Sequence, residues 1–163
     1  MTRGLAAAAT GGAHTMVKKT LIRFIYRCLK LYWFLARPNT FGVQCVIQHS
    51  GAILMVRNTY GQQLWTFPGG GMATHETAEQ AIRREVREEV GLDILNLREI
   101  GVFVCTIDYK RDCVTVFVGD SQDRGVNIDV GEILEAGWVD PQHLPRLSTS
   151  AKKIIAMWEH SAR

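Results

Sequence analysis

The feature that most constrains this chain is a glycine-rich loop followed directly by a helix that turns acidic. Pro68 and the three glycines after it favour a turn in which the backbone adopts unusual dihedral angles and comes close to a ligand. Thr77 is suited to cap a helix together with Gln80, and Gly91 is suited to end one. The sequence therefore predicts a helix over residues 78–90.

The apolar side of this predicted helix becomes acidic partway along. At roughly 100° per residue, one side carries Ala78, Ala81, Ile82, Glu85, Glu88 and Glu89, and the other carries Glu79, Gln80, Arg83, Arg84 and Arg87. Three carboxylates at positions i, i+3 and i+4 repel one another, and here they turn toward the core. A divalent cation removes this conflict, and an all-oxygen site suits Mg²⁺ or Mn²⁺. Taken alone, the acidic string also fits a solvated helix with ion pairs.

The spacing of the whole stretch resembles a complete Nudix box. The matching positions are Gly70, Glu76, Arg84, Glu85, Val86, Glu88, Glu89, Gly91 and Leu92. Family members often have glycine just before the first glutamate, where this chain has His75. The resemblance covers about residues 41–144.

The resemblance implies an α/β fold, namely an α/β/α sandwich around a mixed sheet. It also implies that Glu85, Glu88 and Glu89 hold Mg²⁺, with Mn²⁺ as the alternative, while water attacks phosphorus. The catalytic base is then a box glutamate, Glu88 or Glu89, or else Glu132 from a later loop. For Glu132 the alternative is a solvated loop acid.

The other positions in the resemblance are expected to bind substrate or to shape the loop. Gly70 and Gly71 are expected to approach the substrate, as are Arg57 and the region of Tyr60, although Arg57 also fits a surface cation at a strand end. Tyr109 resembles the tyrosine of dinucleoside polyphosphate hydrolases, and it also fits an ordinary turn. The structural residues are expected to be Gly91 and an ion pair between Glu76 and Arg84 that orients the loop.

The predicted activity is that of a Mg²⁺-dependent pyrophosphohydrolase. Its partner would be a small molecule in which a nucleoside diphosphate is linked to another group: a nucleotide, a dinucleoside polyphosphate or a nucleotide sugar. No specific nucleic acid is expected. A non-catalytic nucleotide sensor on the same fold would be expected to lack box carboxylates, and none is lost here. A third hypothesis places the main function in the N-terminal helix, as a docking element.

Charge is divided unevenly along the 163 residues. Residues 1–37 hold seven Lys and Arg and no acid, whereas the remainder holds 12 basic and 16 acidic residues, a balance of −4. The basicity of the chain therefore belongs to one segment and does not indicate that the domain binds nucleic acid.

The four cysteines lack Cys-x-x-Cys spacing and are expected to be buried, reduced thiols. No apolar run is long enough to span a membrane, so a cytoplasmic chain is expected.

The domain is expected over residues 38–163, after a low-information start at residues 1–15 and a basic amphipathic helix over residues 17–37. The choice of Met1 or Met16 as the start is left open. The apolar side of this N-terminal helix carries Leu21, Phe24, Ile25, Cys28, Leu29, Tyr32 and Leu35, opposite Lys19, Arg23, Arg27 and Lys30. We expect it to pack on the domain or across a homodimer, with contact to an anionic bilayer as the alternative.

Two hairpins and a terminal helix complete the prediction. Strands are expected over residues 41–48 and 52–56, then over 94–107 and 113–118, followed by a strand ending near residue 139. The second hairpin is expected to turn at residues 108–112. A last amphipathic helix, entered at Ser148, is expected over residues 147–158, with Ile154, Ile155 and Trp158 facing inward.

Overall fold

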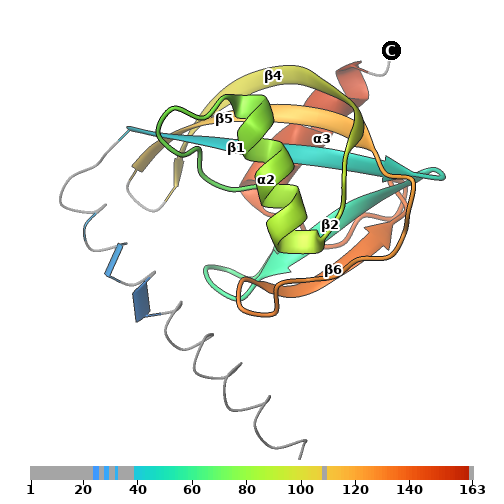
Figure 1. Cartoon of the computed structure of the whole chain (residues 1–163), viewed down its shortest axis with the longest axis horizontal. Coiled ribbons are helices and arrows are strands. Elements are labelled where there is room, and N and C mark those ends of the chain that lie inside the picture. The colour runs from blue at the N-terminus through green and yellow to red at the C-terminus, as the bar shows by residue number, and fades with distance from the viewer. Residues whose placement is uncertain (1–23, 26–27, 30–31, 33–38, 108–109, 162–163) are drawn as a thin grey trace, which may run out of the picture.

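A mixed sheet with one helix on each face forms the domain (Figure 1). The computed structural model describes residues 24–25, 28–29, 32, 39–107 and 110–161. The elements are β1 (Asn39–His49), β2 (Ala52–Asn58), β3 (Trp65–Thr66), α2 (Ala78–Val90), β4 (Leu95–Ile107), β5 (Lys110–Asp120), β6 (Ile133–Val139) and α3 (Thr149–Ser161).

The sheet has the strand order β3-β2-β1-β5-β4, and β6 also pairs with β2. The central strands β1 and β5 run parallel, whereas the other pairs are antiparallel. Both helices pack on this sheet, on opposite faces. The predicted α/β/α sandwich around a mixed sheet is confirmed.

Strands β1 and β2 pair only at their hairpin end and then separate. Their register is Gln48 with Ile53 and His49 with Ala52, across a tight turn at residues 50–51 with positive φ angles of 47° and 79°. Farther along β1, the glycine loop takes the place of β2. The amide groups of Cys45 and Val43 donate hydrogen bonds to the carbonyl groups of residues 68 and 70, at 3.0 and 2.9 Å. The loop is therefore held by backbone pairing with a central strand.

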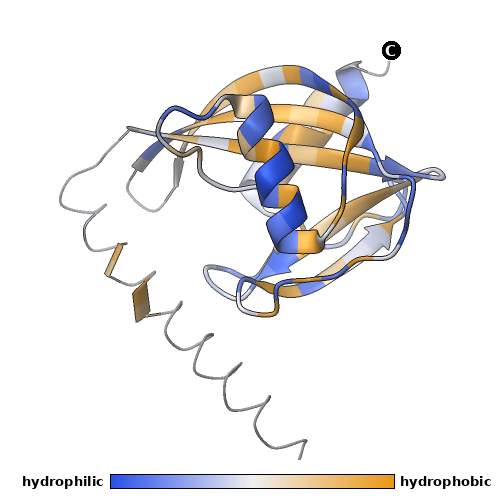
Figure 2. Cartoon of the chain, viewed as in Figure 1, coloured by the Kyte–Doolittle hydropathy of each residue, from blue (hydrophilic) through white to orange (hydrophobic). Residues whose placement is uncertain are grey.

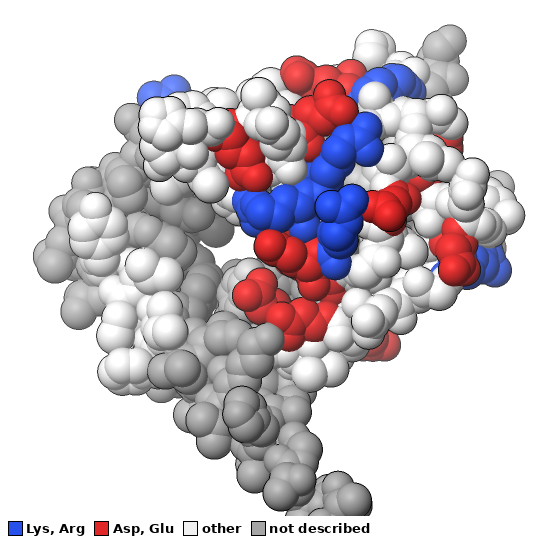
Figure 3. Space-filling model, in the orientation of Figure 1, with Lys and Arg blue, Asp and Glu red and all other residues white. Residues whose placement is uncertain are grey.

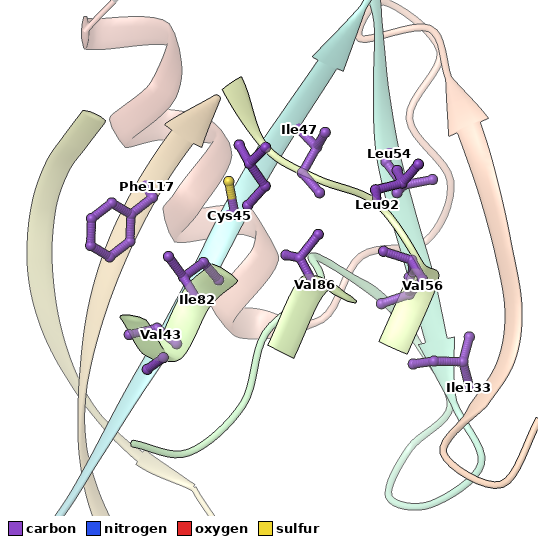
Figure 4. Packing of buried hydrophobic residues seen from close by; sticks show 13 residues of the cluster. Val43, Cys45, Ile47, Leu54, Val56, Ile82, Val86, Leu92, Phe117 and Ile133 are labelled. Atoms are coloured by element: carbon purple, nitrogen blue, oxygen red, sulfur yellow. The ribbon is translucent and has the colours of Figure 1, made fainter. Parts of the chain in front are cut away.

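The period-two pattern of the strands divides the apolar side chains between two cores. The core under α2 contains Val43, Cys45, Ile47, Leu54, Val56, Ala81, Ile82, Val86, Val90, Leu92, Ile94, Phe117 and Ile133 (Figure 4). The core under α3 contains Val46, Ile53, Met55, Phe67, Val114, Val116, Val118, Ala151, Ile154 and Ile155. Both faces of the central strands are thus buried, and each helix is fixed by its own apolar layer.

Helix α2 has the predicted bounds and the predicted cap. The Thr77 hydroxyl accepts a hydrogen bond from the Gln80 amide, the Gln80 side chain accepts one from the Thr77 amide, and Gly91 ends the helix with φ 70°. Figure 2 shows the helix with a hydrophilic outer surface and hydrophobic residues toward the sheet. Local sequence signals alone thus set where this helix begins and ends.

The terminal helix and the second hairpin differ from the prediction at their ends. Helix α3 begins after Ser148, whose hydroxyl accepts from the Ala151 amide at 3.1 Å, and it extends to Ser161, three residues beyond the predicted end. Ile154 and Ile155 are buried and Trp158 is half-buried. Strand β5 begins at Lys110, three residues earlier than predicted, because its ladder with β4 continues to the last pair before residues 108–109.

The cysteine prediction is wrong for three of the four thiols. Only Cys45 is buried; Cys105 and Cys113 are half-buried near the outer edge of the sheet, and Cys28 is exposed. All four are free thiols, as expected.

In the part of the chain that the structure describes, no helix is long and apolar enough to cross a membrane. The expected cytoplasmic location stays a prediction.

We expect Thr77→Ala to lower the free energy of unfolding by about 1 kcal/mol, because the amide groups of the first turn of α2 lose their capping oxygen. Urea denaturation followed by circular dichroism measures this change. The matched control is Thr74→Ala, an exposed threonine in the loop before the helix, for which a change within about 0.5 kcal/mol is expected. Equal effects in the two variants would contradict the capping assignment.

Candidate active site

The glycine loop approaches both β1 and α2 too closely for side chains. Gly69 has φ 141°, and a Cβ atom there would lie 2.1 Å from the carbonyl oxygen of Val43. At Gly70 a Cβ atom would lie 2.6 Å from the carboxylate of Glu85. The backbone of the loop therefore lies directly against the acidic part of the helix.

Arg84 connects the loop to the carboxylates of α2. Its Nε and Nη2 groups donate to Glu76 at 2.9 Å each, and Nη2 also donates to the carbonyl of Gly71 at 3.0 Å. Its Nη1 group donates to Glu85 at 2.8 Å and to Glu88 at 3.1 Å. A guanidinium has five N–H donors, and all five have a partner here.

The Glu76–Arg84 ion pair expected from the sequence is present. Hydrogen bonds from Arg84, together with one from the Ala73 amide, lower the pKa of Glu76 to about 2. Arg84 was expected on the side of the helix opposite the carboxylates, and this expectation is wrong. Arg84 and Glu88 are spaced i, i+4 and are therefore neighbours on the helix surface, so that acidic and basic groups gather on the outer surface of α2 (Figure 3).

Glu89 is the buried member of the acidic group, with 3% of its surface exposed. Its Oε2 atom accepts a hydrogen bond from the amide of Gly69 at 2.8 Å. Burial raises the pKa of Glu89 to about 8, and the charges of Glu85, Glu132 and Glu88 act in the same direction. The amide of Gly69 offsets only part of this rise, so the ionised form of Glu89 is poorly compensated.

The other two acids of the helix lie nearer to water. Burial raises the pKa of Glu85, while the adjacent guanidinium of Arg84 opposes the rise. The side chain of Glu88 is 61% exposed. The three predicted metal ligands thus differ in exposure: Glu89 is buried, Glu85 is half-buried and Glu88 is exposed.

The turn before β6 brings Glu132 to the same place. The amide of Asp129 donates to the carbonyl of Glu89 at 3.1 Å, which fastens this turn to the end of α2. Thr59 fastens it to the end of β2, because its amide donates to the Glu132 carbonyl and its hydroxyl donates to the Gly131 carbonyl, both at 2.8 Å. The charge of Glu132 contributes to the raised pKa values of Glu85 and Glu89. Four acids from two distant segments therefore influence one another.

Arg57 has protein partners at the end of β2. Its Nη1 group forms an ion pair with Glu135 at 2.8 Å, its Nε group donates to the carbonyl of Gln63 at 3.0 Å, and its guanidinium lies 5.9 Å from the centre of the Trp65 ring. The predicted substrate role of Arg57 stays a prediction. Tyr109, another predicted substrate residue, lies outside the described residues.

Asn58 and Tyr60 lie beside the acids, and sequence reasoning missed Asn58. Burial raises the pKa of Tyr60 to about 12, with a further contribution from Glu89, and a hydrogen bond from Asn58 opposes the rise. The Oδ1 atom of Asn58 is the one buried side-chain nitrogen or oxygen atom without a hydrogen-bond partner within the described ranges. An asparagine at the end of a strand carries no sequence signal of this kind.

The position before Glu76 needs the backbone conformation that glycine adopts readily. His75 has φ 66°, in the left-handed region. The histidine there departs from the usual box preference without changing the set of acids. Histidine at this position therefore holds the loop in a left-handed backbone conformation that is strained for a residue with a side chain.

The donors of this site suit a hard divalent cation. Glu85, Glu88 and Glu89 supply only carboxylate oxygens, and the one guanidinium nearby reaches Glu85 and Glu88 with all its donors in use. In the described part of the chain, no three His, Cys, Asp or Glu side chains already stand together as a metal site. Arg84 bridges two of the three acids, Glu85 and Glu88, through its Nη1 group.

A NUDIX domain family model matches residues 36–158, which is most of the chain, and the chain therefore belongs to the NUDIX domain family. It is similar to the RNA pyrophosphohydrolase of Sodalis glossinidius (strain morsitans), with 48% identity over 120 residues that cover 63% of this chain and 67% of that protein. It is also similar to the RNA pyrophosphohydrolase of Cellvibrio japonicus (strain Ueda107), with 40% identity over 75 residues. That match covers 46% of this chain and only 41% of the relative.

The fold also resembles that of a solved structure, a MutT NUDIX hydrolase from Burkholderia pseudomallei. The TM-score is 0.68 at 19% identity, over 73% of this chain and 97% of that one. At this identity the likeness shows the fold alone. It agrees with the family assignment from the sequence.

We expect Glu89→Gln to change how stability depends on pH when no cation is added. A raised native pKa means that the folded protein binds the proton more tightly, so its free energy of unfolding should fall as the pH rises from about 4.5 toward 8. Each unit of pKa difference corresponds to about 1.4 kcal/mol. Glutamine keeps an oxygen for the Gly69 amide and carries no charge, so the variant should lose most of this decline and exceed the parent above pH 8.

Urea denaturation in a chelator at pH 4, 7 and 9, values that bracket the shift from about 4.5 to 8, provides the measurement. The control is Glu159→Gln, an exposed glutamate on α3 across the sheet, which should follow the parent at every pH. A parent whose stability rises steadily through this range, with the Glu89 variant in parallel, would show that Glu89 is ionised in the native state without strain.

Proposed function

We propose that this chain is a divalent-cation-dependent hydrolase that cleaves a phosphoanhydride bond in a nucleotide derivative. The observation that carries the proposal is that three helix carboxylates and Glu132 lie together beside the glycine loop. The backbone of this loop comes close to them because its glycines have no side chains. Such a site repels anions until a cation is present, and it then becomes selective for ligands that bring phosphate oxygens to that cation. Membership of the NUDIX domain family supports the same activity.

Glu85, Glu88 and Glu89 would hold the cation, Mg²⁺ or Mn²⁺. When bound, a cation of this kind neutralises phosphate charge and lowers the pKa of water. Without it, Glu89 keeps its proton near neutral pH because its pKa is raised to about 8. Arg84 holds Glu76, the loop carbonyl of Gly71 and Glu85 in register, and is thus a positioning residue.

The general base would be one of Glu88, Glu89 and Glu132. Glu89 is held through Oε2 by the Gly69 amide and is buried, which leaves it little freedom to move toward a water molecule. Glu132 is half-buried on a turn whose backbone is fastened at Asp129 and Thr59. A positioned carboxylate outside the cation ligands can accept a proton while the ligands remain ionised, so Glu132 is the favoured base.

The substrate we favour is the 5′ end of an RNA. Internucleotide links are phosphodiesters, so a pyrophosphohydrolase acting on RNA must cleave at a terminal phosphoanhydride. Two relatives with 48% and 40% identity are named RNA pyrophosphohydrolases, and this supports the choice. It differs from the small-molecule partner expected from the sequence, since the same chemistry would take place at the end of a polymer.

A non-catalytic nucleotide sensor is less well supported. Such a protein needs no group to activate water, whereas here Glu132 adds a fourth acid from a segment more than forty residues after the helix. Buried and half-buried acids destabilise the fold, so their presence here is better explained by a function than by packing. The site is therefore built for more than nucleotide binding.

We expect Glu88→Gln and Glu89→Gln each to lower kcat/KM by about a hundredfold or more, because each removes a charged ligand of the cation. The matched control is Glu79→Gln on the first turn of α2, whose carboxylate pairs with Arg83 away from the acidic group. Rates should be measured on a confirmed substrate at saturating Mg²⁺, with circular dichroism to show that the variants fold. If both site variants kept near-parental rates, the assignment of the cation ligands would be wrong.

A substrate panel with product detection tests the bond and the substrate. A short 5′-triphosphorylated RNA, a dinucleoside polyphosphate, a nucleotide sugar and a nucleoside monophosphate should be compared in ¹⁸O-labelled water. We expect label in a phosphate product from the RNA, and no reaction with the monophosphate, since that has no anhydride bond. Rapid release of phosphate from the monophosphate alone would refute phosphoanhydride hydrolysis, and preference for another derivative would refute the RNA substrate only.

A further inference from the structure

An apolar stripe stands exposed before the first strand. The described residues in this part of the chain, Phe24, Ile25, Cys28, Leu29 and Tyr32, are helical. Phe24 is 64% exposed, Tyr32 57%, Ile25 47% and Leu29 41%. At helical spacing these positions fall on one side, so the exposed apolar area forms a continuous stripe instead of scattered patches.

The charges around this stripe all have one sign. Residues 1–37 contain seven Lys and Arg and no Asp or Glu. Arg23, Arg27 and Lys30 are the cations interleaved in the sequence with the residues of the stripe. Exposed apolar side chains in a segment whose charges are all cationic are the pattern of a helix that lies at the interface of an anionic bilayer.

We propose that the stripe of Phe24, Ile25, Leu29 and Tyr32 is an interfacial anchor, which binds an anionic lipid surface. The apolar side chains enter the boundary between headgroups and acyl chains, while the cations contact lipid phosphates. The remainder of the chain carries a net charge of −4 and is repelled by the same surface. Binding therefore depends on this segment alone.

The surface of the domain is a poorer partner for the stripe. Its exposed apolar residues near the end of the sheet are Phe41, Val102 and Val104, and the register Phe41–Cys113–Val104 places the first and last in one row across β1, β5 and β4. This rim is only three side chains wide, and the exposed Arg111 lies two residues before Cys113 on the same strand. A basic helix would meet both too little apolar area and a like charge there.

Vesicle co-sedimentation of the full chain tests the proposal. Vesicles of phosphatidylcholine alone are compared with vesicles that also contain phosphatidylserine, at low and high salt. We expect binding to the anionic vesicles only, weakened by salt. Phe24→Ser/Leu29→Ser should lower the partition coefficient by about tenfold or more, since two apolar side chains no longer enter the interface.

Two further variants separate lipid binding from other roles of the segment. Arg23→Gln/Arg27→Gln, which keeps the stripe, should weaken binding to anionic vesicles and reduce its salt dependence. Phe41→Ser/Val104→Thr, which removes exposed apolar area from the rim of the sheet, should bind as the parent does. Circular dichroism verifies the fold of each variant.

Three results would overturn the proposal. The first is failure of the parent chain to bind anionic vesicles. The second is equal binding by the stripe variant and the parent. The third is a parent that is oligomeric by light scattering, becomes monomeric in the stripe variant and binds no vesicles, which would assign the stripe to a second copy of the chain.

Discussion

The buried carboxylate of Glu89 is the constraint on which the site depends. An acid on the apolar side of a helix destabilises the fold when it ionises, and its pKa of about 8 reflects that penalty. The helix is nevertheless held in place, because its side chains Ile82, Val86 and Val90 pack in the core between α2 and the sheet and fix the rotation of the helix. Glu89 cannot turn outward without removing these side chains from the core. The apolar packing of α2 is therefore what keeps an unfavourable charge in position.

The separation of β1 from β2 provides the space in which this charge can act. Had the two strands paired along their whole length, β2 would occupy the edge of β1 that now receives the glycine loop. The amide of Gly69 could not then reach Glu89. The widened gap also lets the end of β2, at Thr59, fasten the turn that carries Glu132. A local departure from sheet regularity thus brings three distant segments together.

Much of this arrangement follows from local sequence signals, and the remainder depends on tertiary contacts. The bounds of α2 were predictable because a capping box and a left-handed glycine act within a few residues. The box acids were predictable from fixed spacing on one helix. The pair of Arg84 with Glu76 was expected, but its hydrogen bonds to Glu85 and Glu88 were not, because one guanidinium can divide its donors among several acids at once. The orphan oxygen of Asn58 and the extended start of β5 likewise depend on neighbours that no local pattern specifies.

Arg84 compensates the negative charge of the acidic group only in part. Its five N–H donors are divided among Glu76, the carbonyl of Gly71, Glu85 and Glu88, so none is left for Glu89. One positive charge is therefore shared among three carboxylates, and a fourth, Glu89, has only a backbone amide. Protonation of Glu89 relieves the imbalance in the absence of a cation. In the proposed cation site a divalent ion would relieve it more fully, and Glu88, the most exposed of these acids, is the one best placed to exchange the guanidinium for the ion. The exposure of Glu88 is what makes this exchange feasible, because an acid that is already solvated can change partners without opening the core.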